Sequence, residues 1–362
     1  MKLALVHDWL VNLGGAERVL IELHKIFPDA PIYTLFYNKK FQADYLPDAE
    51  IRPSFLQKFP LIAKRYKLFA VLMPSAVESF DLSDFDLVIS SSVFFSKGLV
   101  LRPKTKHICY CYSPARQLWD LHQIQNSKFK ILNSMAQHLL RLWDRQAADR
   151  ADELVAISKT VSSRIKKYYK KDAKVIYPPV TELPEGEERR PMEKEYYLIV
   201  SRLFPHKNVD VAIEAFNKLG LELVVIGDGP SKKELKKTAN KNIRFLGRVS
   251  DDIVATYYRH AKAFIMPQEE DFGLTPVEAM RFGVPTLALR KGGAVETIQE
   301  GVTGEFFDDP ISEALADGIR RLTENSRKYC PNLIKDRSRQ FSKEIFRKKI
   351  LELASTCSSK HG

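Results

Sequence analysis

The sequence predicts an α/β protein of two domains, each built on a parallel β-sheet. Three observations support this prediction: short apolar strands alternate with amphipathic helices, the alternation restarts after a linker-like segment, and 362 residues suffice for two domains. With 44% hydrophobic and 28% charged residues, the composition is that of an ordinary globular protein.

Apolar runs and turn residues place the individual elements. In the first half, Gly14-Gly15 predicts a turn that leads into a helix over 16–27. Strands of this half are expected over 2–7, 87–92, 107–112 and 153–158. The second half restarts the pattern, with strands expected over 196–201, 221–227, 243–247, 263–266 and 286–289.

A linker is predicted over 177–195, which carries four prolines and a run of charged residues. It separates an N-terminal domain, 1–176, from a C-terminal domain, 196–338. Open α/β sheets bind ligands at the carboxyl ends of their strands. The site is therefore expected in a cleft between the two domains.

Charge and cysteine content narrow the choice of partners and compartment. The net charge of +12 favours an anionic partner, whether nucleic acid, anionic lipid or a phosphorylated substrate. The four cysteines are too few and too scattered for a disulfide framework or a four-cysteine zinc site, which fits a reducing cytosol. The first residues reach His7-Asp8 too early for a signal peptide, and no apolar run approaches the roughly 18–20 residues of a membrane span.

The clearest chemistry lies in Glu270 and Glu278, eight residues apart, with Phe272-Gly273-Leu274 between them. The glycine predicts a turn that opens a helix, and a helix start attracts phosphate through its unpaired N–H groups and positive dipole end. Carboxylates repel phosphate but accept hydrogen bonds from sugar hydroxyls. This combination suits a sugar nucleotide, although the spacing alone also fits two surface glutamates.

Other strand ends of the second half add compatible chemistry. Arg202 and Lys207 follow its first strand; arginine clasps phosphate as a fork, and lysine adds a movable charge. Gly-Asp-Gly-Pro at 227–230 and Gly-Gly at 292–293 follow two further strands. There glycine either lets the backbone approach a ligand closely or simply makes a turn.

As an ordered set, these motifs resemble the donor domain of the retaining GT-B glycosyltransferases, specifically glycosyltransferase family 4. The resemblance covers nearly all of 196–307, through Ser-Arg-Leu-x3-Lys at 201–207, Gly-Asp-Gly-Pro at 227–230, Phe-Leu-Gly-x-Val at 245–249, Glu-x7-Glu at 270–278, Phe-Gly-Val-Pro at 282–285 and Gly-Gly-x2-Glu-Thr-Ile at 292–298. It implies two Rossmann-like domains facing across a cleft, with the C-terminal helix, within 339–362, crossing back to the first domain. The first domain would then face the acceptor.

The resemblance also implies roles for the charged residues. Arg202 and Lys207 would hold the donor diphosphate, Glu278 would bind the ribose hydroxyls, and Glu270 would face the transferred sugar. Further donor contacts would come from the segment Phe272, Gly273, Leu274 and Thr275, from Gly247 and Val249 beside the base, and from Gly14 and Gly15 across the cleft. A plain helix-entry turn is the alternative for Gly14 and Gly15.

The segment from His107 to Asp120 resembles a bacterial surface-polysaccharide branch of the family, many of whose members are mannosyltransferases. Tyr112 stands where histidine is common, near the reaction centre. A tyrosine hydroxyl donates a hydrogen bond, but with an ordinary pKa near 10 it is a poor base at neutral pH. Because the family is thought to pass the acceptor proton to the leaving phosphate, activity is still expected; His107 could instead be a core histidine.

The resemblance therefore implies a catalytic set of Glu270, Tyr112, Arg202 and Lys207. Asp84-x-Asp86 has the form of a metal-chelating motif but lacks the surrounding donor-site elements, so it is interpreted as a loop. No metal and no cofactor are expected, and Arg202 and Lys207 would neutralise the leaving group.

A membrane-facing segment is predicted over 51–77, which has no acidic residue and interleaves basic with apolar side chains. A second basic cluster at 164–171 could extend this face. Docking on the cytoplasmic leaflet would bring the enzyme to an acceptor linked to polyprenyl diphosphate. The alternative is an ordinary surface helix with snorkelling lysines.

The leading hypothesis is the transfer of a hexose, with mannose from GDP-mannose as the first guess, to a lipid-linked glycan. A sugar-nucleotide 2-epimerase has the same two-domain architecture, and a catalytically silent sugar-nucleotide binder is a further alternative. Nucleic acid is not expected as a partner, because only the net charge favours it and no recognition module is visible.

Overall fold

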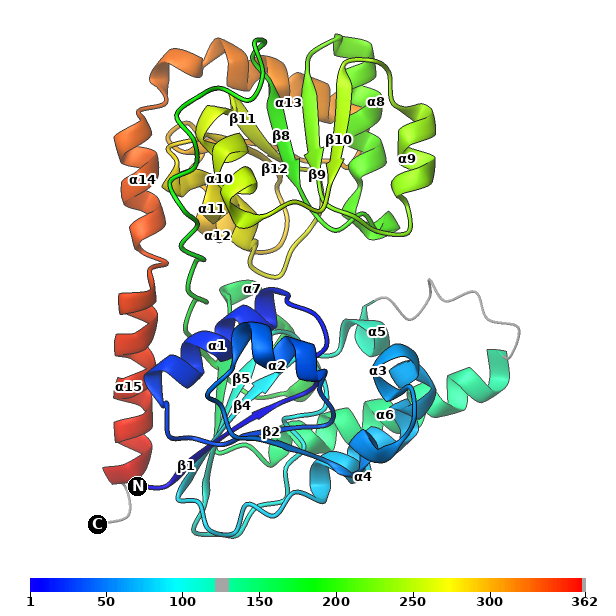
Figure 1. The fold of residues 1–362 in the computed structure, drawn as a ribbon, viewed down its shortest axis with the longest axis vertical. Coiled ribbons are helices and arrows are strands. Elements are labelled where there is room, and N and C mark those ends of the chain that lie inside the picture. The colour runs from blue at the N-terminus through cyan, green and yellow to red at the C-terminus, as the bar shows by residue number, and fades with distance from the viewer. Residues whose placement is uncertain (121–129, 360–362) are drawn as a thin grey trace. The chain divides into compact units, whose positions relative to one another are not determined.

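The computed structural model describes residues 1–120 and 130–359, and the chain divides into two compact units. Unit 1 comprises Met1–Pro179 and Lys343–Gly362, and unit 2 comprises Val180–Ser342 (Figure 1). The proline-rich segment that the sequence analysis assigns to a linker contributes its residues from Val180 onward to unit 2.

Unit 1 contains a seven-stranded parallel sheet in the order β3-β2-β1-β4-β5-β6-β7. Its strands are β1 Leu3–His7, β2 Ile32–Thr34, β3 Ile51–Pro53, β4 Leu87–Ser92, β5 Lys106–Cys111, β6 Glu153–Ala156 and β7 Lys174–Val175. Every residue of β1 and β4 is buried, which explains their continuous apolar or small-residue sequences. β1 lies between β2 and β4, so the loops after β1 and β4 are neighbours at the carboxyl edge of the sheet.

Helices cover the sheet of unit 1. They are α1 Gly15–Ile26, α2 Lys39–Tyr45, α3 Ile62–Arg65, α4 Met73–Glu78, α5 Arg116–Trp119, α6 Lys130–Asp149, α7 Lys159–Tyr169 and α15 Lys343–Ser359, with short 3-10 helices η1 Phe55–Lys58 and η2 Tyr66–Leu72. The C-terminal helix α15 belongs to this unit, as the resemblance predicts: the ring of Phe346 packs edge-on against Tyr110 of β5, with centroids 5.8 Å apart. It starts at Lys343 rather than 339, because α14 (Pro331–Arg339) precedes it in unit 2.

Unit 2 contains a six-stranded parallel sheet in the order β10-β9-β8-β11-β12-β13. The strands are β8 Tyr197–Val200, β9 Leu223–Ile226, β10 Ile243–Gly247, β11 Ala263–Met266, β12 Thr286–Leu289 and β13 Gly304–Phe307. The helices are α8 Val209–Leu219, α9 Lys232–Thr238, α10 Asp251–His260, α11 Leu274–Arg281, α12 Ala294–Thr297, α13 Ser312–Glu324 and α14, with 3-10 helices η4 Pro205–Lys207 and η5 Ser326–Lys328. The strand order reverses at β8, which places the loops after β8 and β11 side by side.

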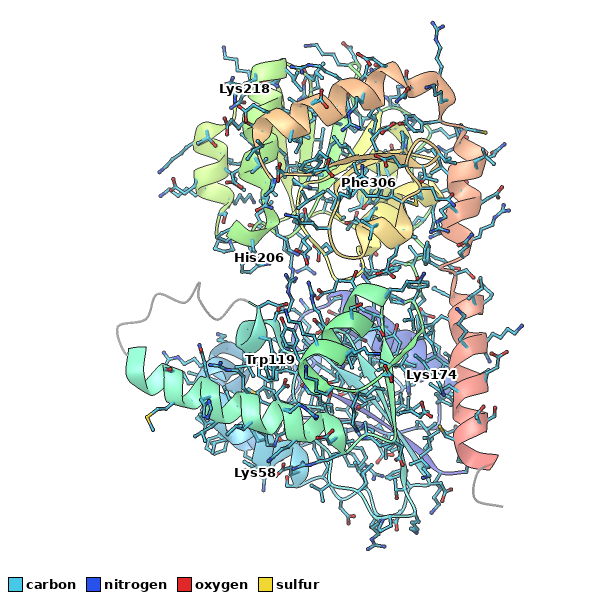
Figure 2. The ribbon with its side chains drawn as sticks, turned by 180° about the vertical axis from the view of Figure 1, so that it is seen from behind. Lys58, Trp119, Lys174, His206, Lys218 and Phe306 are labelled. Atoms are coloured by element: carbon cyan, nitrogen blue, oxygen red, sulfur yellow. The ribbon has the colours of Figure 1, made fainter. Side chains whose placement is uncertain are left out.

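A buried ion pair holds α6 in unit 1. The Nζ of Lys97 lies 2.6 Å from Oδ1 of Asp144, and both side chains are almost fully buried. The other oxygen of Asp144 accepts hydrogen bonds from the indole of Trp119 and the hydroxyl of Tyr169, each at 2.8 Å; Trp119 is labelled in Figure 2. Burial disfavours the charged form of Lys97, but the Asp144 carboxylate holds the pKa of that lysine above its usual value.

Replacing Lys97 by Met should destabilise unit 1 by about 3–5 kcal/mol, because Asp144 would keep its charge in a buried site without its cation. All three tryptophans of the chain, at positions 9, 119 and 143, lie in unit 1, so their fluorescence during urea denaturation reports on this unit. Adding Asp144→Asn should recover part of the loss. The matched control is Arg145→Ala on α6, the helix that carries Asp144. It breaks the more exposed pair of Arg145 with Asp149 and should change stability by about 0.5 kcal/mol or less. Equal effects of Lys97→Met and Arg145→Ala would contradict the prediction.

Candidate functional site

Lys207 and Glu270 meet at the carboxyl edge of the unit 2 sheet. Lys207 ends η4, which follows β8, and Glu270 follows β11, the neighbouring strand. The Nζ of Lys207 lies 2.5 Å from Oε1 of Glu270. The lysine side chain is 8% exposed and the glutamate side chain 27% exposed. Two residues that the sequence predicts for one site are thus brought into direct contact.

The charge state of Glu270 follows from its neighbours. Burial opposes ionisation, but the ammonium of Lys207, aided by the Gln268 amide and the charge of Arg202, holds the pKa of Glu270 below its usual value. Glu270 is therefore a carboxylate at neutral pH and can only accept hydrogen bonds. Arg202 itself is exposed, with its guanidinium 5.7 Å from the ring centroid of Phe204.

Glycines let the loops of the site pack directly on one another. A Cβ at Gly227 would lie 1.9 Å from the backbone oxygen of Ser201, and one at Gly292 would lie 2.2 Å from that of Glu270. The N–H of Gly293 also donates to the Glu270 carbonyl at 2.8 Å. The glycine motifs thus bring backbone close to neighbouring loops, whereas the sequence motifs suggest a close approach only toward a ligand.

The helix α11 begins as the sequence predicts. Gly273 precedes it with φ +88°, a left-handed conformation that favours glycine. Leu274 and Thr275 lie in its first turn, where backbone N–H groups have no partner within the helix. Glu278, one turn further on, is half-buried, and its Oε2 accepts a hydrogen bond from the hydroxyl of Tyr258 at 3.2 Å.

The remaining predicted residues of unit 2 lie nearer its core. The ring of Phe272 is buried and packs edge-on against Phe341, with centroids 5.4 Å apart. Gly247 ends β10 with φ +76°, and the half-buried Val249 packs against the hydrophobic core. The side chain of Phe272 therefore serves packing, and only its backbone could approach a ligand.

In unit 1, separate hydrogen bonds hold Tyr112 and the Gly14-Gly15 turn against the start of α1. The Tyr112 hydroxyl donates to the carbonyl of Ala16 at 2.9 Å and lies 2.8 Å from the hydroxyl of Ser91. Glu17 accepts from the N–H of Gly14 at 2.9 Å. Burial raises the pKa of Tyr112 well above its usual value, so this tyrosine is not a base at neutral pH.

Sequence reasoning missed Asp8 as an organiser of unit 1. Its buried carboxylate follows β1 and accepts hydrogen bonds from the backbone N–H groups of 93–96, at 2.5 to 3.0 Å. A charged residue directly after an apolar strand is the signal that could have revealed it. His107 is a buried histidine that bonds to Ser90 at 2.8 Å, and burial lowers its pKa to about 4, as expected for a core residue.

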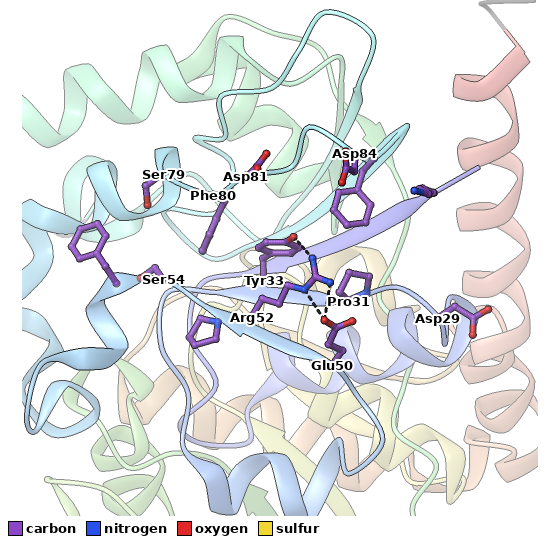
Figure 3. A pocket seen from close by; sticks show the side chains of 14 residues that line it. Asp29, Pro31, Tyr33, Glu50, Arg52, Ser54, Ser79, Phe80, Asp81 and Asp84 are labelled. Carbon is purple, nitrogen blue, oxygen red and sulfur yellow. Dashed lines mark hydrogen bonds and ion pairs between the residues drawn. The ribbon is translucent and has the colours of Figure 1, made fainter.

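The motif Asp84-x-Asp86 lies at the opposite, amino edge of the unit 1 sheet. Asp86 accepts from the backbone N–H of Lys2 at 2.8 Å, and Asp84 lines a cavity of about 640 Å³. In this cavity Arg52 is already held by Glu50 and Tyr33 (Figure 3). The exposed carboxylates at its rim would repel a diphosphate. Among residues 1–120 and 130–359, no cluster of three or more His, Cys, Asp or Glu side chains could hold a metal ion.

Two units, each built on a parallel Rossmann-like sheet, are the architecture of the GT-B glycosyltransferases. Residues 13–182 match the family described as Glycosyltransferase Family 4, and residues 182–340 match the Glycosyl transferases group 1. The chain belongs to this family of transferases, which confirms the fold class and the enzyme class predicted from its motifs.

Curated relatives carry related names. An uncharacterized glycosyltransferase of Methanocaldococcus jannaschii is 29% identical over 56% of this chain and 59% of its own length. The alpha-1,3/1,6-mannosyltransferase ALG2 of Candida glabrata is 23% identical over 97% of this chain and 91% of its own. A GDP-mannose-dependent alpha-(1-6)-phosphatidylinositol monomannoside mannosyltransferase of Mycobacterium tuberculosis is 28% identical over 49% of this chain and 54% of its own.

Solved structures share the fold. A sucrose-phosphate synthase from Thermosynechococcus elongatus superposes with a TM-score of 0.77 at 16% identity, over 99% of this chain and 100% of that one. The Anabaena protein HepE, solved in complex with UDP-glucose, gives 0.70 at 19% identity, over 98% and 100% of the two chains. These identities are too low to transfer a substrate.

Tyr112→Phe should lower the stability of unit 1 by about 1 kcal/mol, the value of one neutral hydrogen bond, and leave turnover within a few-fold of wild type. Tyr110→Phe is the control, because it removes another buried hydroxyl, bonded to the Ile176 carbonyl at 2.9 Å. Urea denaturation and sugar-transfer rates over a range of pH provide the measurements. A hundredfold slower Tyr112→Phe enzyme with unchanged stability would instead give the hydroxyl a chemical role.

Proposed function

We propose that the enzyme transfers a hexose from a nucleotide diphosphate sugar to a glycan acceptor with retention of the anomeric configuration. The observation that carries this proposal is the Lys207–Glu270 pair beside the start of α11. It combines a cation and free helix N–H groups, which bind a diphosphate, with a carboxylate, which binds sugar hydroxyls. These are the groups that a sugar nucleotide requires, held on adjacent strand ends of one unit.

The roles proposed for the individual residues are those that the family resemblance implies. Arg202 and Lys207 bind the diphosphate and stabilise the charge that develops on it as the sugar leaves. Glu278, whose carboxylate is oriented by Tyr258, binds the ribose hydroxyls. Glu270 accepts a hydrogen bond from the transferred sugar; because it is ionised, it does not act as an acid. The acceptor proton passes to the leaving phosphate.

Other donor contacts come from the backbone. Gly273, Leu274 and Thr275 offer the N–H groups of the α11 start, and Gly247 with Val249 lies beside the base. Gly14 and Gly15 belong to unit 1, so their contact with the diphosphate stays a prediction of the family resemblance.

GDP-mannose is the proposed donor, mannose is the transferred sugar, and a glycan linked to polyprenyl diphosphate is the proposed acceptor. The names of the Candida and Mycobacterium relatives support the mannosyl assignment. A 2-epimerase would convert its sugar nucleotide without any acceptor, and a silent binder would bind it without turnover. Release of the nucleoside diphosphate only when a glycan acceptor is added therefore separates the proposed activity from both alternatives.

A thermal-shift panel of UDP, GDP and their sugars tests the donor assignment. GDP and GDP-mannose should raise the melting temperature, because a ligand at 100 times its Kd stabilises the folded state by about 2.7 kcal/mol. Glu278→Ala should weaken the response to the preferred nucleotide, since a ribose contact is lost. The control is Glu234→Ala, which removes a surface carboxylate paired with Lys237 in the same unit. A larger response to UDP than to GDP would replace the guanine assignment, and an undiminished response in Glu278→Ala would remove its ribose role.

Unit 1 exposes an apolar and basic surface that supports the proposed membrane partner. Large exposed hydrophobic side chains in the predicted segment are Phe55, Phe59, Leu61, Leu68, Val71 and Leu72. On α6, Met135, Leu139 and Leu142 are each more than half exposed and recur at helical spacing, so they form one apolar stripe. Trp143 of α6 donates to Glu78 of α4 at 2.8 Å, so the two helices are in contact.

We therefore define the membrane face as residues 55–72 together with the α6 stripe, and propose that it docks on the anionic cytoplasmic leaflet. The basic cluster at 164–171 contributes less than expected, because Arg164, Lys166 and Lys171 are paired with aspartates. None of the helices that the structure describes in 1–120 and 130–359 is long and apolar enough to cross a bilayer.

Flotation with anionic vesicles should recover the wild-type enzyme but recover much less of Lys64→Glu/Arg65→Glu and of Leu139→Ser/Leu142→Ser. The first variant weakens the electrostatic attraction to the anionic vesicle, and the second removes apolar side chains that would enter the membrane. Lys233→Glu/Lys236→Glu in unit 2 makes the same change of charge outside the face and should float like wild type. Equal recovery of all variants, or equal recovery with neutral vesicles, would contradict docking through this face.

A further inference from the structure

Gln268 contacts the same carboxylate oxygen as Lys207. It lies between β11 and Glu270 and is 3% exposed. Its Nε2 donates to Oε1 of Glu270 at 3.0 Å, and Lys207 donates to the same Oε1 at 2.5 Å. Within the described part of the chain, no group donates to the other oxygen, Oε2. The two oxygens of one partly exposed carboxylate are therefore in different environments.

The orientation of the Gln268 amide follows from the charge of Glu270. An ionised carboxylate only accepts, so the NH2 group of the amide must face it. The amide oxygen then points away, and it is buried with no hydrogen-bond donor among the residues that the structure describes. A buried acceptor without a partner is unfavourable. An apolar side chain would avoid this penalty, so the amide serves something other than the stability of the core.

Two donors on one oxygen restrict rotation of the carboxylate. If Oε1 is held by Lys207 and Gln268, Oε2 is the oxygen left to accept a hydrogen bond from outside. We propose that Gln268 is a positioning residue that presents Oε2 of Glu270 to a hydroxyl of the transferred sugar. This inference rests on the proposed function and assigns a determinant of sugar binding within the same site.

The proposal separates binding of the sugar from binding of the nucleotide. A nucleoside diphosphate without its sugar contacts Arg202, Lys207 and the α11 start, but it has no hydroxyl for Oε2 of Glu270. The ratio of the Kd for the nucleoside diphosphate to the Kd for the sugar nucleotide therefore measures the contribution of the sugar. A residue with a merely structural role would change both constants together.

Calorimetric titration of Gln268→Leu with GDP, GDP-mannose, UDP and UDP-glucose tests the proposal. For whichever base binds the wild type, the variant should keep the Kd of the diphosphate within about twofold, while the Kd of the sugar nucleotide rises roughly tenfold, a loss of about 1.4 kcal/mol. Gln340→Leu is the control, because it removes an exposed glutamine of the same unit that is bonded to Arg337. It should change neither constant.

The pH dependence of sugar binding gives a second readout. Burial favours the neutral form of Glu270, and the donations from Lys207 and Gln268 oppose it. Removing the Gln268 donor raises the pKa of Glu270. As the pH is lowered, the contribution of the sugar to binding should therefore disappear at a higher pH in the variant than in the wild type. Gln268→Glu, which places a second carboxylate beside the first, should shift this loss further in the same direction and serves as the test variant if Gln268→Leu does not fold.

The outcomes distinguish the inference from the proposed function. An unchanged sugar contribution in both Gln268 variants would overturn the positioning role while leaving the donor site intact. Equal weakening of diphosphate and sugar nucleotide would also overturn it, because that pattern indicates a structural role. A wild-type enzyme that binds none of the four ligands would instead refute the proposed function, and the inference with it.

Discussion

The contact between Lys207 and Glu270 joins two segments that are more than sixty residues apart in the sequence. It forms because β8 and β11 are neighbours in a parallel sheet, so the residues that follow them emerge at the same edge. Each partner makes the other tolerable: the ammonium keeps the glutamate ionised in a partly buried position, and the carboxylate satisfies a lysine that is almost fully buried. Glycines on both sides then allow the surrounding loops to close on this pair.

In unit 1, a carboxylate also follows a strand of the parallel sheet, but its hydrogen-bond partners are different. There the residue after β1 is Asp8, and its carboxylate binds backbone N–H groups of the loop after β4 instead of a side-chain cation. All of its acceptor capacity is directed into the protein. The two carboxylates follow different strands: Asp8 follows β1, the first strand of unit 1, whereas Glu270 follows β11, the neighbour of the first strand of unit 2. Asp8 faces inward and has a structural role, whereas Glu270 is partly exposed, which is one reason to propose the donor site in unit 2.

The repeated strand pattern and the ordered motifs predicted both sheets, the turn at Gly273 and the membership of Lys207 and Glu270 in one site, but not the direct contact between these two side chains. Four strands were not predicted from the sequence. β2, β3 and β7 have only two or three residues, too few for a periodic signal, and β13 begins with Gly304. Gln268 escaped because a glutamine in a loop carries no sequence signal; its meaning comes from burial and from the oxygen that it shares with Lys207. The glycine pairs left two interpretations open, a close approach to a ligand or a simple turn, and the distances show a third feature, close packing against the backbone of neighbouring loops.

The close packing of Gly292 and Gly293 on the segment 270–272 has an evolutionary consequence. Neither position has space for a Cβ, and the backbone at Glu270 is bonded to that of Gly293, so this stretch of main chain cannot shift without breaking the loop that supports it. Under the proposed role of Glu270 in sugar binding, descendants of this enzyme that adopt a different sugar would therefore have to change the side chains around a fixed backbone. A change in the backbone of this loop is not available as a way to change the sugar specificity.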